Sequence, residues 1–101
     1  MILKILRVKG NSLAPRCRSG DYVVASGLAL RLRPCRPGDL VVFDHPEYGR
    51  LIKRVEGVQP GGWLDVRGQD IDSIDSRLFG PLPPASIWGR VIWHIGASRH
   101  S

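Results

Sequence analysis

Two short segments of the chain, GDYVVAS (20–26) and GDLVVFD (38–44), have almost the same sequence. Each begins with Gly-Asp, a pair typical of tight turns, and continues with a β-branched apolar run typical of a buried strand. Twelve glycines and eight prolines recur along the 101 residues and leave little room for long helices. These features predict short strands joined by turns.

Three further segments extend this pattern along the chain. ILKILRV at 2–8 is predicted as a strand, because the run is too short for a helix before the next glycine. Residues 50–58 and 63–68 are predicted as the two arms of a hairpin across the turn QPGG.

The last strand is expected at 86–96, where Gly89 indicates a bulge. Residues 28–33 alternate Leu with Arg and favour a short strand or an irregular connection with its arginines facing solvent. The sequence therefore predicts an all-β fold of about six short strands without a long helix.

Length and composition favour one small domain covering residues 1–101. A hydrophobic content of 43% is ordinary for a globular chain and argues against disorder. No run of 18 apolar residues is present, so no membrane-spanning helix is expected. The charged N-terminal segment MILKILRVKG lacks the apolar core of a signal peptide, so we expect a cytoplasmic location.

The net charge of +6 is unevenly distributed, because residues 1–50 hold nine Lys/Arg and four Asp/Glu, against six and five in residues 51–101. A non-catalytic basic module that binds nucleic acid or an acidic protein is therefore an alternative function. The aromatic residues Tyr22, Phe43 and Trp63 are expected in strand cores, which disfavours nucleic acid as the partner. The arginines of such a patch would be Arg16, Arg18, Arg31, Arg33 and Arg36.

The two cysteines, Cys17 and Cys35, form no CxxC pair and have no nearby histidines, so no zinc or other metal site is predicted. A disulfide between them is possible but not required, and free thiols are expected in a reducing compartment.

One turn, VKGNSLAP at 8–15, places Ser12 between residues that favour tight bends. A serine nucleophile needs a base to take its proton. His45 in a turn, His94 in the final strand and His100 in the tail are not in positions that indicate a placed base.

A lysine can act as this base when burial keeps it neutral. On a strand, Lys53 shares one face with Leu51 and Val55, whereas the opposite face carries Arg54 and Glu56. Lys53 is therefore a candidate base, with an edge or surface lysine as the alternative.

The loop at 69–84, QDIDSIDSRLFGPLPP, is rich in Asp and Ser and is expected to be irregular. It lacks the spacing of an EF-hand calcium loop. Asp75 and Arg77 are predicted to pair and brace this loop, so that one of its serines can orient a neutral lysine.

Four segments in this order resemble the boxes of the signal peptidase I group of Ser/Lys proteases. GNSLAP is similar to the nucleophile box, and RSGDYVVAS to the strand that follows it. GDLVVFDHP with LIKRVEGVQPGG is similar to the box that holds the general-base lysine, and DSIDSRLFGPLPPASIWGRV to the last box. The resemblance implies the coiled β-barrel-type core of the signal peptidases and of the self-cleaving SOS-response repressors.

The resemblance also implies a role for each matched residue. Ser12 would be the nucleophile and Lys53 its general base, with Ser73 hydrogen-bonded to the lysine. Asp75 and Arg77 would be the ion pair that supports the active-site loop. The backbone N–H of Ser12 would stabilise the oxyanion, aided by the turn at Gly10 and Asn11.

The implied reaction is peptide-bond hydrolysis through an acyl-enzyme, with no cofactor, on a precursor protein bound in extended form. The group prefers small residues just before the cut. Neither a membrane anchor nor the large insertion of the bacterial secretory enzymes, between Gly57 and Trp63, is found here.

Small anchorless members of the group include the proposed maturation protease of nickel-type superoxide dismutase. We therefore expect removal of an N-terminal leader or propeptide, with that enzyme as the precursor. General signal-peptidase-like processing is the alternative. Only eleven residues precede Ser12, which disfavours self-cleavage of the SOS-repressor kind.

Overall fold

The computed structural model describes residues 3–8, 20–68 and 75–96, and these residues contain the six strands expected from the sequence. The strands are β1 (Leu3–Arg7), β2 (Tyr22–Ser26), β3 (Leu40–His45), β4 (Gly49–Val58), β5 (Leu64–Arg67) and β6 (Ile87–Ile95).

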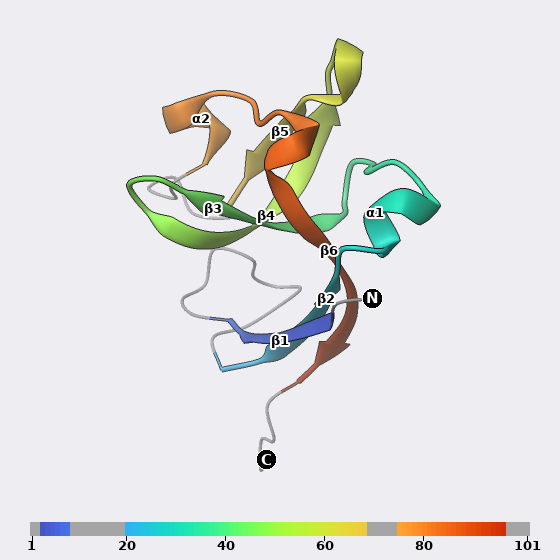
Figure 1. The fold of residues 1–101 in the computed structure, drawn as a ribbon. Helices are drawn as coiled ribbons and strands as arrows, with labels where there is room; N and C mark the ends of the chain where they lie inside the picture. The colour runs from blue at the N-terminus through green and yellow to red at the C-terminus, as the bar shows by residue number, and fades with distance from the viewer. Residues whose placement is uncertain (1–2, 9–19, 69–74, 97–101) are drawn as a thin grey trace.

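The strands form one sheet in the order β1-β2-β6-β3-β4-β5, and neighbouring strands are antiparallel. β6 lies at the centre of this order, because its first half pairs with β3 and its second half with β2. In Figure 1, β6 runs from the β3–β4–β5 half of the molecule down to the β1–β2 half. The predicted hairpin is confirmed, since β4 and β5 pair across the short helix η1 (Pro60–Gly62).

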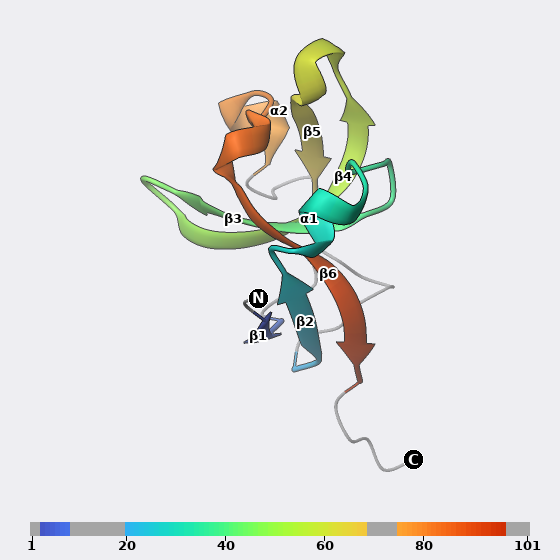
Figure 2. The same ribbon diagram turned by 45° about the vertical axis from the view of Figure 1, so that its right-hand side comes forward.

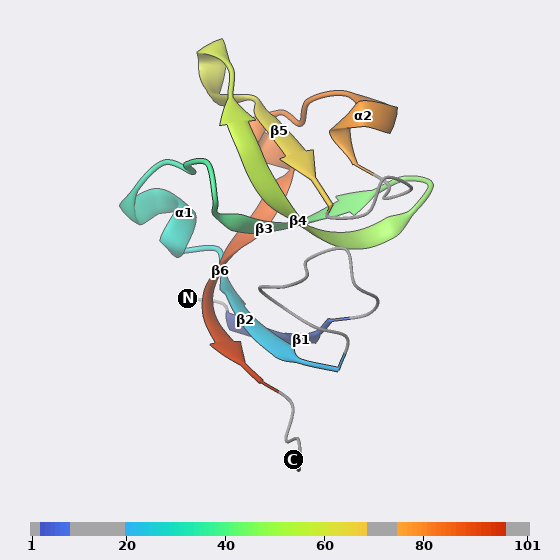
Figure 3. The same ribbon diagram turned by 180° about the vertical axis from the view of Figure 1, so that it is seen from behind.

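Helices in the described part of the chain are single turns. α1 (Ala29–Leu32) packs against β6, as Figure 2 shows, and η2 (Pro84–Ser86) leads directly into that strand. α2 (Ser76–Phe79) lies beside β5 (Figure 3). The prediction of a strand or irregular segment at 28–33 was wrong, whereas the prediction of an all-β fold without long helices is confirmed. Across the ranges the structure describes, we find no helix with the length and apolarity to cross a bilayer.

The two Gly-Asp segments have the same hydrogen-bonding pattern. Gly20 donates to the carbonyl of Val8 at 2.9 Å, and the carbonyl of Asp21 accepts from Val8 at 2.7 Å. In the second segment, the same pair of bonds joins Gly38 and Asp39 to Val55, at 2.8 and 2.7 Å. Both glycines have positive φ, a conformation that other residues rarely adopt. The near-repeat in sequence is therefore a near-repeat in structure.

Two hydrophobic clusters lie on either side of β3. The larger contains Val41 and Phe43 with apolar residues of β4, β5 and β6, and the smaller contains Leu40 with Val8 and Val23. Alternate residues of a strand point to opposite faces, so β3 contributes to both clusters. The smaller cluster joins β1 and β2 to β3 and β4, whereas the larger cluster fills the part of the sheet formed by β3, β4, β5 and the start of β6.

The predicted bulge in the last strand is confirmed next to Gly89. Val42 pairs with Gly89, whereas the next residue, Phe43, pairs with Ile87, so Trp88 is the extra residue. A Cβ on Gly89 would lie 3.2 Å from the carbonyl atoms of Ser26. This glycine therefore allows β6 to approach the end of β2 closely.

Candidate active site

Lys53 lies in the middle of β4, and only 5% of its surface is exposed. Its cross-strand neighbour is Val41 of β3, and Val41 and Val55 both belong to the larger cluster. On the opposite face of β4, Arg54 and Glu56 form an ion pair near the surface. The predicted division of this strand into an apolar face with Lys53 and a charged face is confirmed.

The residue after β5 lies opposite Lys53. Arg67 pairs with Arg54, and the same antiparallel register places Gly68 across from Lys53. The backbone N–H of Gly68 donates to Oδ2 of Asp75 at 3.0 Å. The segment that begins at Asp75 is therefore anchored beside the strand position of Lys53.

Alternate N–H groups on the outer edge of β5 are satisfied by the segment 75–82. Leu64 donates to the carbonyl of Leu82 at 2.8 Å, Val66 donates to Oγ of Ser76 at 2.9 Å, and Gly68 donates to Asp75. Two side chains and one carbonyl thus replace a neighbouring strand and cover the edge of the sheet.

Asp75 and Arg77 form the ion pair expected from the sequence. Nε and Nη2 of Arg77 donate to the two carboxylate oxygens at 3.1 and 2.8 Å, and the backbone N–H of Arg77 donates to Oδ1 at 3.0 Å. Asp75 is fully buried and caps the N-terminus of α2. The predicted ion pair is therefore confirmed. That it supports the active-site loop during catalysis stays a prediction.

The environment of Asp75 favours the ionised carboxylate. Burial alone would raise its pKa, but the hydrogen bonds from the Arg77 side chain and from the backbone of Gly68 and Arg77 outweigh burial and hold the pKa below its usual value. A charge-assisted network of this kind fixes the loop against β5.

Four of the predicted site residues, Gly10, Asn11, Ser12 and Ser73, lie outside the described residues. The structure therefore does not test the Ser12–Lys53 dyad or the contact of Ser73 with the lysine. Lys53, Asp75 and Arg77 are described. Gly68, which lies opposite Lys53 and donates to Asp75, connects the lysine with the ion pair.

The described histidines have structural contacts. Nδ1 of His45 accepts from the backbone N–H of Glu47 at 3.1 Å, and its ring packs against Phe79. His45 is the last residue of β3. The prediction that it lies in a turn was therefore wrong. His94 lies in the final strand as predicted, with Nε2 at 2.8 Å from Oδ2 of the buried Asp21.

The predicted arginine patch is only partly available for binding. Arg33 donates twice to Asp39, at 2.9 and 3.0 Å, so this arginine has an acidic partner within the chain. Arg31 and Arg36 are exposed, and Arg16 and Arg18 are not described. The pairing of Arg33 weakens the binding-module alternative.

The expected burial of the aromatic residues was partly wrong. Phe43 is fully buried, but Tyr22 and Trp63 are exposed. Tyr22 begins β2 and Trp63 precedes β5, and at strand ends an aromatic side chain need not enter the core.

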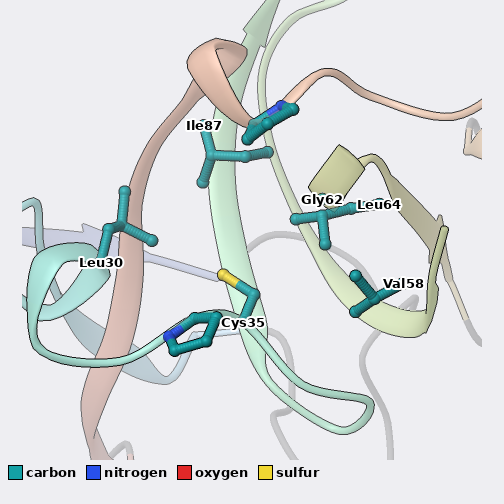
Figure 4. A pocket seen from close by; sticks show the side chains of 8 residues that line it. Leu30, Cys35, Val58, Gly62, Leu64 and Ile87 are labelled. Atoms are coloured by element: carbon teal, nitrogen blue, oxygen red, sulfur yellow. The ribbon is translucent and has the colours of Figure 1, made fainter. Parts of the chain in front are cut away.

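A pocket of about 300 Å³ lies between α1, η1 and η2 (Figure 4). Its lining is mostly apolar, and the sulfur of Cys35 projects into it. Burial raises the pKa of this free thiol, which keeps it protonated and poorly reactive. Val58, at the pocket, is five residues from Lys53, roughly 16 Å along the strand. The pocket is thus separate from the candidate site.

No group of three His, Cys, Asp or Glu side chains suited to a metal ion occurs within the ranges 3–8, 20–68 and 75–96.

Ser76 is the residue of this region that sequence reasoning missed. Its hydroxyl accepts from Val66 and helps to anchor α2 on β5. Asp is a preferred N-cap residue, so Asp75 before the short segment SRLF was the signal that could have indicated α2 and its cap.

Comparison with known proteins gives a family match over most of the chain. The model for the family described as signal peptidase, peptidase S26, matches residues 1–72. This range includes Ser12 and Lys53 and ends before Ser73, Asp75 and Arg77.

The chain is also similar to three mitochondrial proteins. It is 32% identical, over 111 residues, to mitochondrial ATP-independent inner membrane protease subunit 1b of Arabidopsis thaliana, covering 85% of this chain and 66% of that protein. It is 26% identical, over 113 residues, to mitochondrial inner membrane protease subunit 1 of Mus musculus and of Homo sapiens, covering 90% of this chain and 68% of each relative. The chain thus spans about two thirds of the length of these relatives.

Proposed function

Because the chain belongs to the signal peptidase S26 family, we propose that it is a serine endopeptidase in which Ser12 is the nucleophile and Lys53 the general base. The observation that carries this proposal is the burial of Lys53 on the apolar face of β4, opposite a loop anchored by Asp75. A general base must be neutral to accept a proton, and apolar burial disfavours the charged form of an amine.

In the proposal, the nucleophile segment reaches Lys53 from Val8, the last described residue before it. Val8 is buried in the smaller cluster, against which Ile52 packs, and Ile52 is next to Lys53 in the sequence. Ser12 is four residues beyond Val8, a stretch of chain that reaches up to roughly 14 Å. The proposal requires Ser12 to meet the amine within this length of chain.

The anchored loop supplies the third member of the proposed site. Ser73 is two residues before Asp75, whose carboxylate binds Gly68, so its Cα can lie at most roughly 7 Å from that of Asp75. In the proposal, Asp75 and Arg77 hold the loop, and the hydroxyl of Ser73 orients the amine of Lys53.

The proposed reaction has two steps. Oγ of Ser12 attacks the scissile carbonyl carbon while Lys53 takes the hydroxyl proton, and the resulting oxyanion is stabilised by the N–H of Ser12 in the turn at Gly10 and Asn11. The tetrahedral intermediate collapses, Lys53 gives its proton to the leaving amine, and an ester with Ser12 remains. Water, deprotonated by Lys53, then hydrolyses the ester and restores the serine.

We propose an extended segment near the N-terminus of a precursor protein as the substrate. The names of the relatives, inner membrane proteases, support protein processing as the general activity. Nickel-type superoxide dismutase is the precursor that the resemblance to small anchorless members suggests, and general leader removal is the broader alternative. A cytoplasmic location is part of this proposal.

Co-expression with the candidate precursor tests the proposal. Mass spectrometry of the purified precursor should show a new N-terminus with the wild-type chain, and the full-length precursor with Ser12→Ala. Ser86→Ala is a matched control, because Ser86 is a half-buried hydroxyl that donates to the carbonyl of Pro83 at 2.7 Å. Trimming that persists with Ser12→Ala would rule out this serine as the nucleophile. An untouched precursor with the wild-type chain would rule out that substrate.

A further inference from the structure

The pocket between α1, η1 and η2 opens onto the hydrophobic core. Its floor includes Leu64 and Ile87, which are buried members of the larger cluster, and Leu30 and Cys35 pack against that cluster. Its rim includes Val58, which keeps 44% of its surface exposed. Figure 4 shows these side chains around the pocket. An apolar pocket with a buried floor and an open rim is the usual form of a small-molecule site.

The volume and lining of the pocket limit the chemistry of an occupant. A dry cavity of about 150 Å³ holds one benzene ring, so the pocket of about 300 Å³ accommodates a group of roughly ten carbon atoms. Among the eight described residues that line it, Cys35 is the one whose side chain can form a hydrogen bond, and a thiol is a weak donor. The enclosed part of an occupant should therefore be hydrocarbon.

Charges are unevenly distributed around the pocket. The wall that includes α1, residues 30–37, contains Arg31, Arg33 and Arg36 and no acidic residue. The walls formed by residues 58–64 and 82–87 contain no charged residue. A bound molecule would therefore meet positive charge at one end and only apolar or neutral groups at the other.

Two of these arginines can accept an anionic partner. Arg33 already has an acidic partner within the chain. Within the described ranges, no ion pair involves the side chains of Arg31 and Arg36, and both residues are exposed. Each directly follows a lining residue, Leu30 or Cys35, and adjacent Cα atoms are about 3.8 Å apart. Both side chains therefore begin beside the pocket.

A further guanidinium group lies near the thiol. Arg90 of β6 is only 6% exposed, and its side chain makes one hydrogen bond with the described residues, to the carbonyl of Arg33 at 3.2 Å. Burial and Asp39 raise the pKa of the Cys35 thiol, whereas Arg90 and Arg33 oppose them. Both guanidinium groups thus lie within electrostatic range of this part of the pocket, which favours an anion there.

We propose that this pocket binds an aliphatic monocarboxylate of about six to ten carbon atoms. Its hydrocarbon chain lies between η1 and η2, and its carboxylate lies at the rim beside Arg31 and Arg36. The planar guanidinium group suits this partner, because it can donate two parallel hydrogen bonds to one carboxylate. The proposal does not depend on the peptidase activity, since the pocket is separate from Lys53.

Isothermal titration calorimetry of the purified chain with straight-chain carboxylates tests the proposal. We expect saturable binding of octanoate with a Kd below about 1 mM. From butanoate to octanoate, each added methylene should tighten binding about fourfold, because it buries more hydrocarbon. The gain should end near about twelve carbon atoms, when the pocket is full. Octylamine, which has the same chain and the opposite charge, should bind at least about tenfold more weakly.

A double variant tests the recognition of the carboxylate. Arg31→Gln with Arg36→Gln should weaken octanoate binding about fivefold or more and leave the binding of octanol unchanged. Arg7→Gln with Arg67→Gln is the matched control, because it removes two exposed arginines that do not line this pocket. Circular dichroism of both double variants is compared with that of the wild type first.

The thiol of Cys35 reports where the ligand binds, because its sulfur projects into the pocket. In a Cys17→Ser chain, Cys35 is the one remaining cysteine, and its modification by methyl methanethiosulfonate is followed by mass spectrometry. Octanoate at about ten times its Kd should slow this modification about tenfold. Acetate at the same concentration should not, because it has no chain to fill the pocket.

Four results would each overturn the proposal. They are no saturable binding up to about 5 mM octanoate, octylamine binding as tight as that of octanoate, an equal loss of affinity in the two double variants, and octanoate binding that leaves Cys35 unprotected. The peptide acetyl-Ala-Ala-Leu tests a chain terminus as the source of the carboxylate. Tighter binding of this peptide than of octanoate would assign the pocket to a peptide C-terminus instead.

Discussion

The backbone N–H of Gly68 donates to Oδ2 of Asp75 at 3.0 Å, and this bond fastens the start of α2 to the end of β5. Gly68 lies opposite Lys53, so the bond positions the loop relative to the buried lysine. The same carboxylate accepts three hydrogen bonds from Arg77. One buried side chain therefore couples the edge of the sheet to the candidate site.

Replacing Asp75 by Ala should lower the free energy of unfolding by about 2–4 kcal/mol, since buried donors lose their charged acceptor. Urea unfolding followed by circular dichroism measures this change. Asp44→Ala is the matched control, because Asp44 also pairs with one arginine, Arg50, but in an exposed position. A loss for Asp75→Ala no larger than that of the control would contradict the anchoring role.

Stability should fall in acid. Burial opposes ionisation of both Asp39 and Asp75, but hydrogen bonds from Arg33 and Arg77 outweigh it and hold both pKa values below the ordinary value of about 3.9. The unfolded chain therefore binds protons first as the pH falls, so the stabilisation is complete well above about pH 4 and is lost below it. Urea midpoints across this range measure how steeply stability falls with decreasing pH, and this fall should be shallower in Asp75→Asn. The same fall in Asp75→Asn and the wild type would show that Asp75 does not contribute to the loss of stability in acid.

Gly89→Ala should destabilise the fold by about 1–3 kcal/mol, because its Cβ would meet the backbone of Ser26 at 3.2 Å and separate β6 from β2. Gly57→Ala is the control, since no atom lies within 4 Å of the Cβ it would add. Thermal unfolding compares the two variants. Similar midpoints for both would mean that the contact at Gly89 relaxes without cost.

The six strands were predictable because their apolar β-branched runs are local and are bounded by turn residues such as Gly20 and Gly38. The order of the strands was not predictable, because β6 pairs with both β2 and β3, far from it in the sequence. α1 was missed because four residues are too few for helical periodicity, and its Leu–Arg alternation resembles a strand. There, a hydrogen bond from Ala29 to the hydroxyl of Ser26, at 3.2 Å, starts the turn.

In the candidate site, the apolar surroundings of Lys53 were predictable from the two-residue period of β4, and the Asp75–Arg77 pair from their spacing. The hydrogen bond from Val66 at the β5 edge to the hydroxyl of Ser76 was not predictable, since it depends on the tertiary packing of the segment that begins at Asp75. Whether Ser12 and Ser73 meet the lysine stays a prediction.

A lysine base also predicts the pH dependence of the reaction. The general base acts only when deprotonated, so kcat/KM for a peptide substrate should rise with pH and reach a plateau. Initial rates from about pH 5 to about pH 9 measure this profile, with circular dichroism at each pH to exclude unfolding. A flat profile over this range would count against a lysine base.

The account depends most directly on Lys53, and its replacement by Met tests it, because Met retains an apolar chain of similar length without the amine. We expect Lys53→Met to fold and to lower kcat/KM for peptide cleavage by about 10²–10⁴-fold. Arg54→Met, on the same strand but on its opposite, charged face, should keep a rate close to that of the wild type. Cleavage by Lys53→Met at the rate of Arg54→Met would contradict the assignment of Lys53 as the general base.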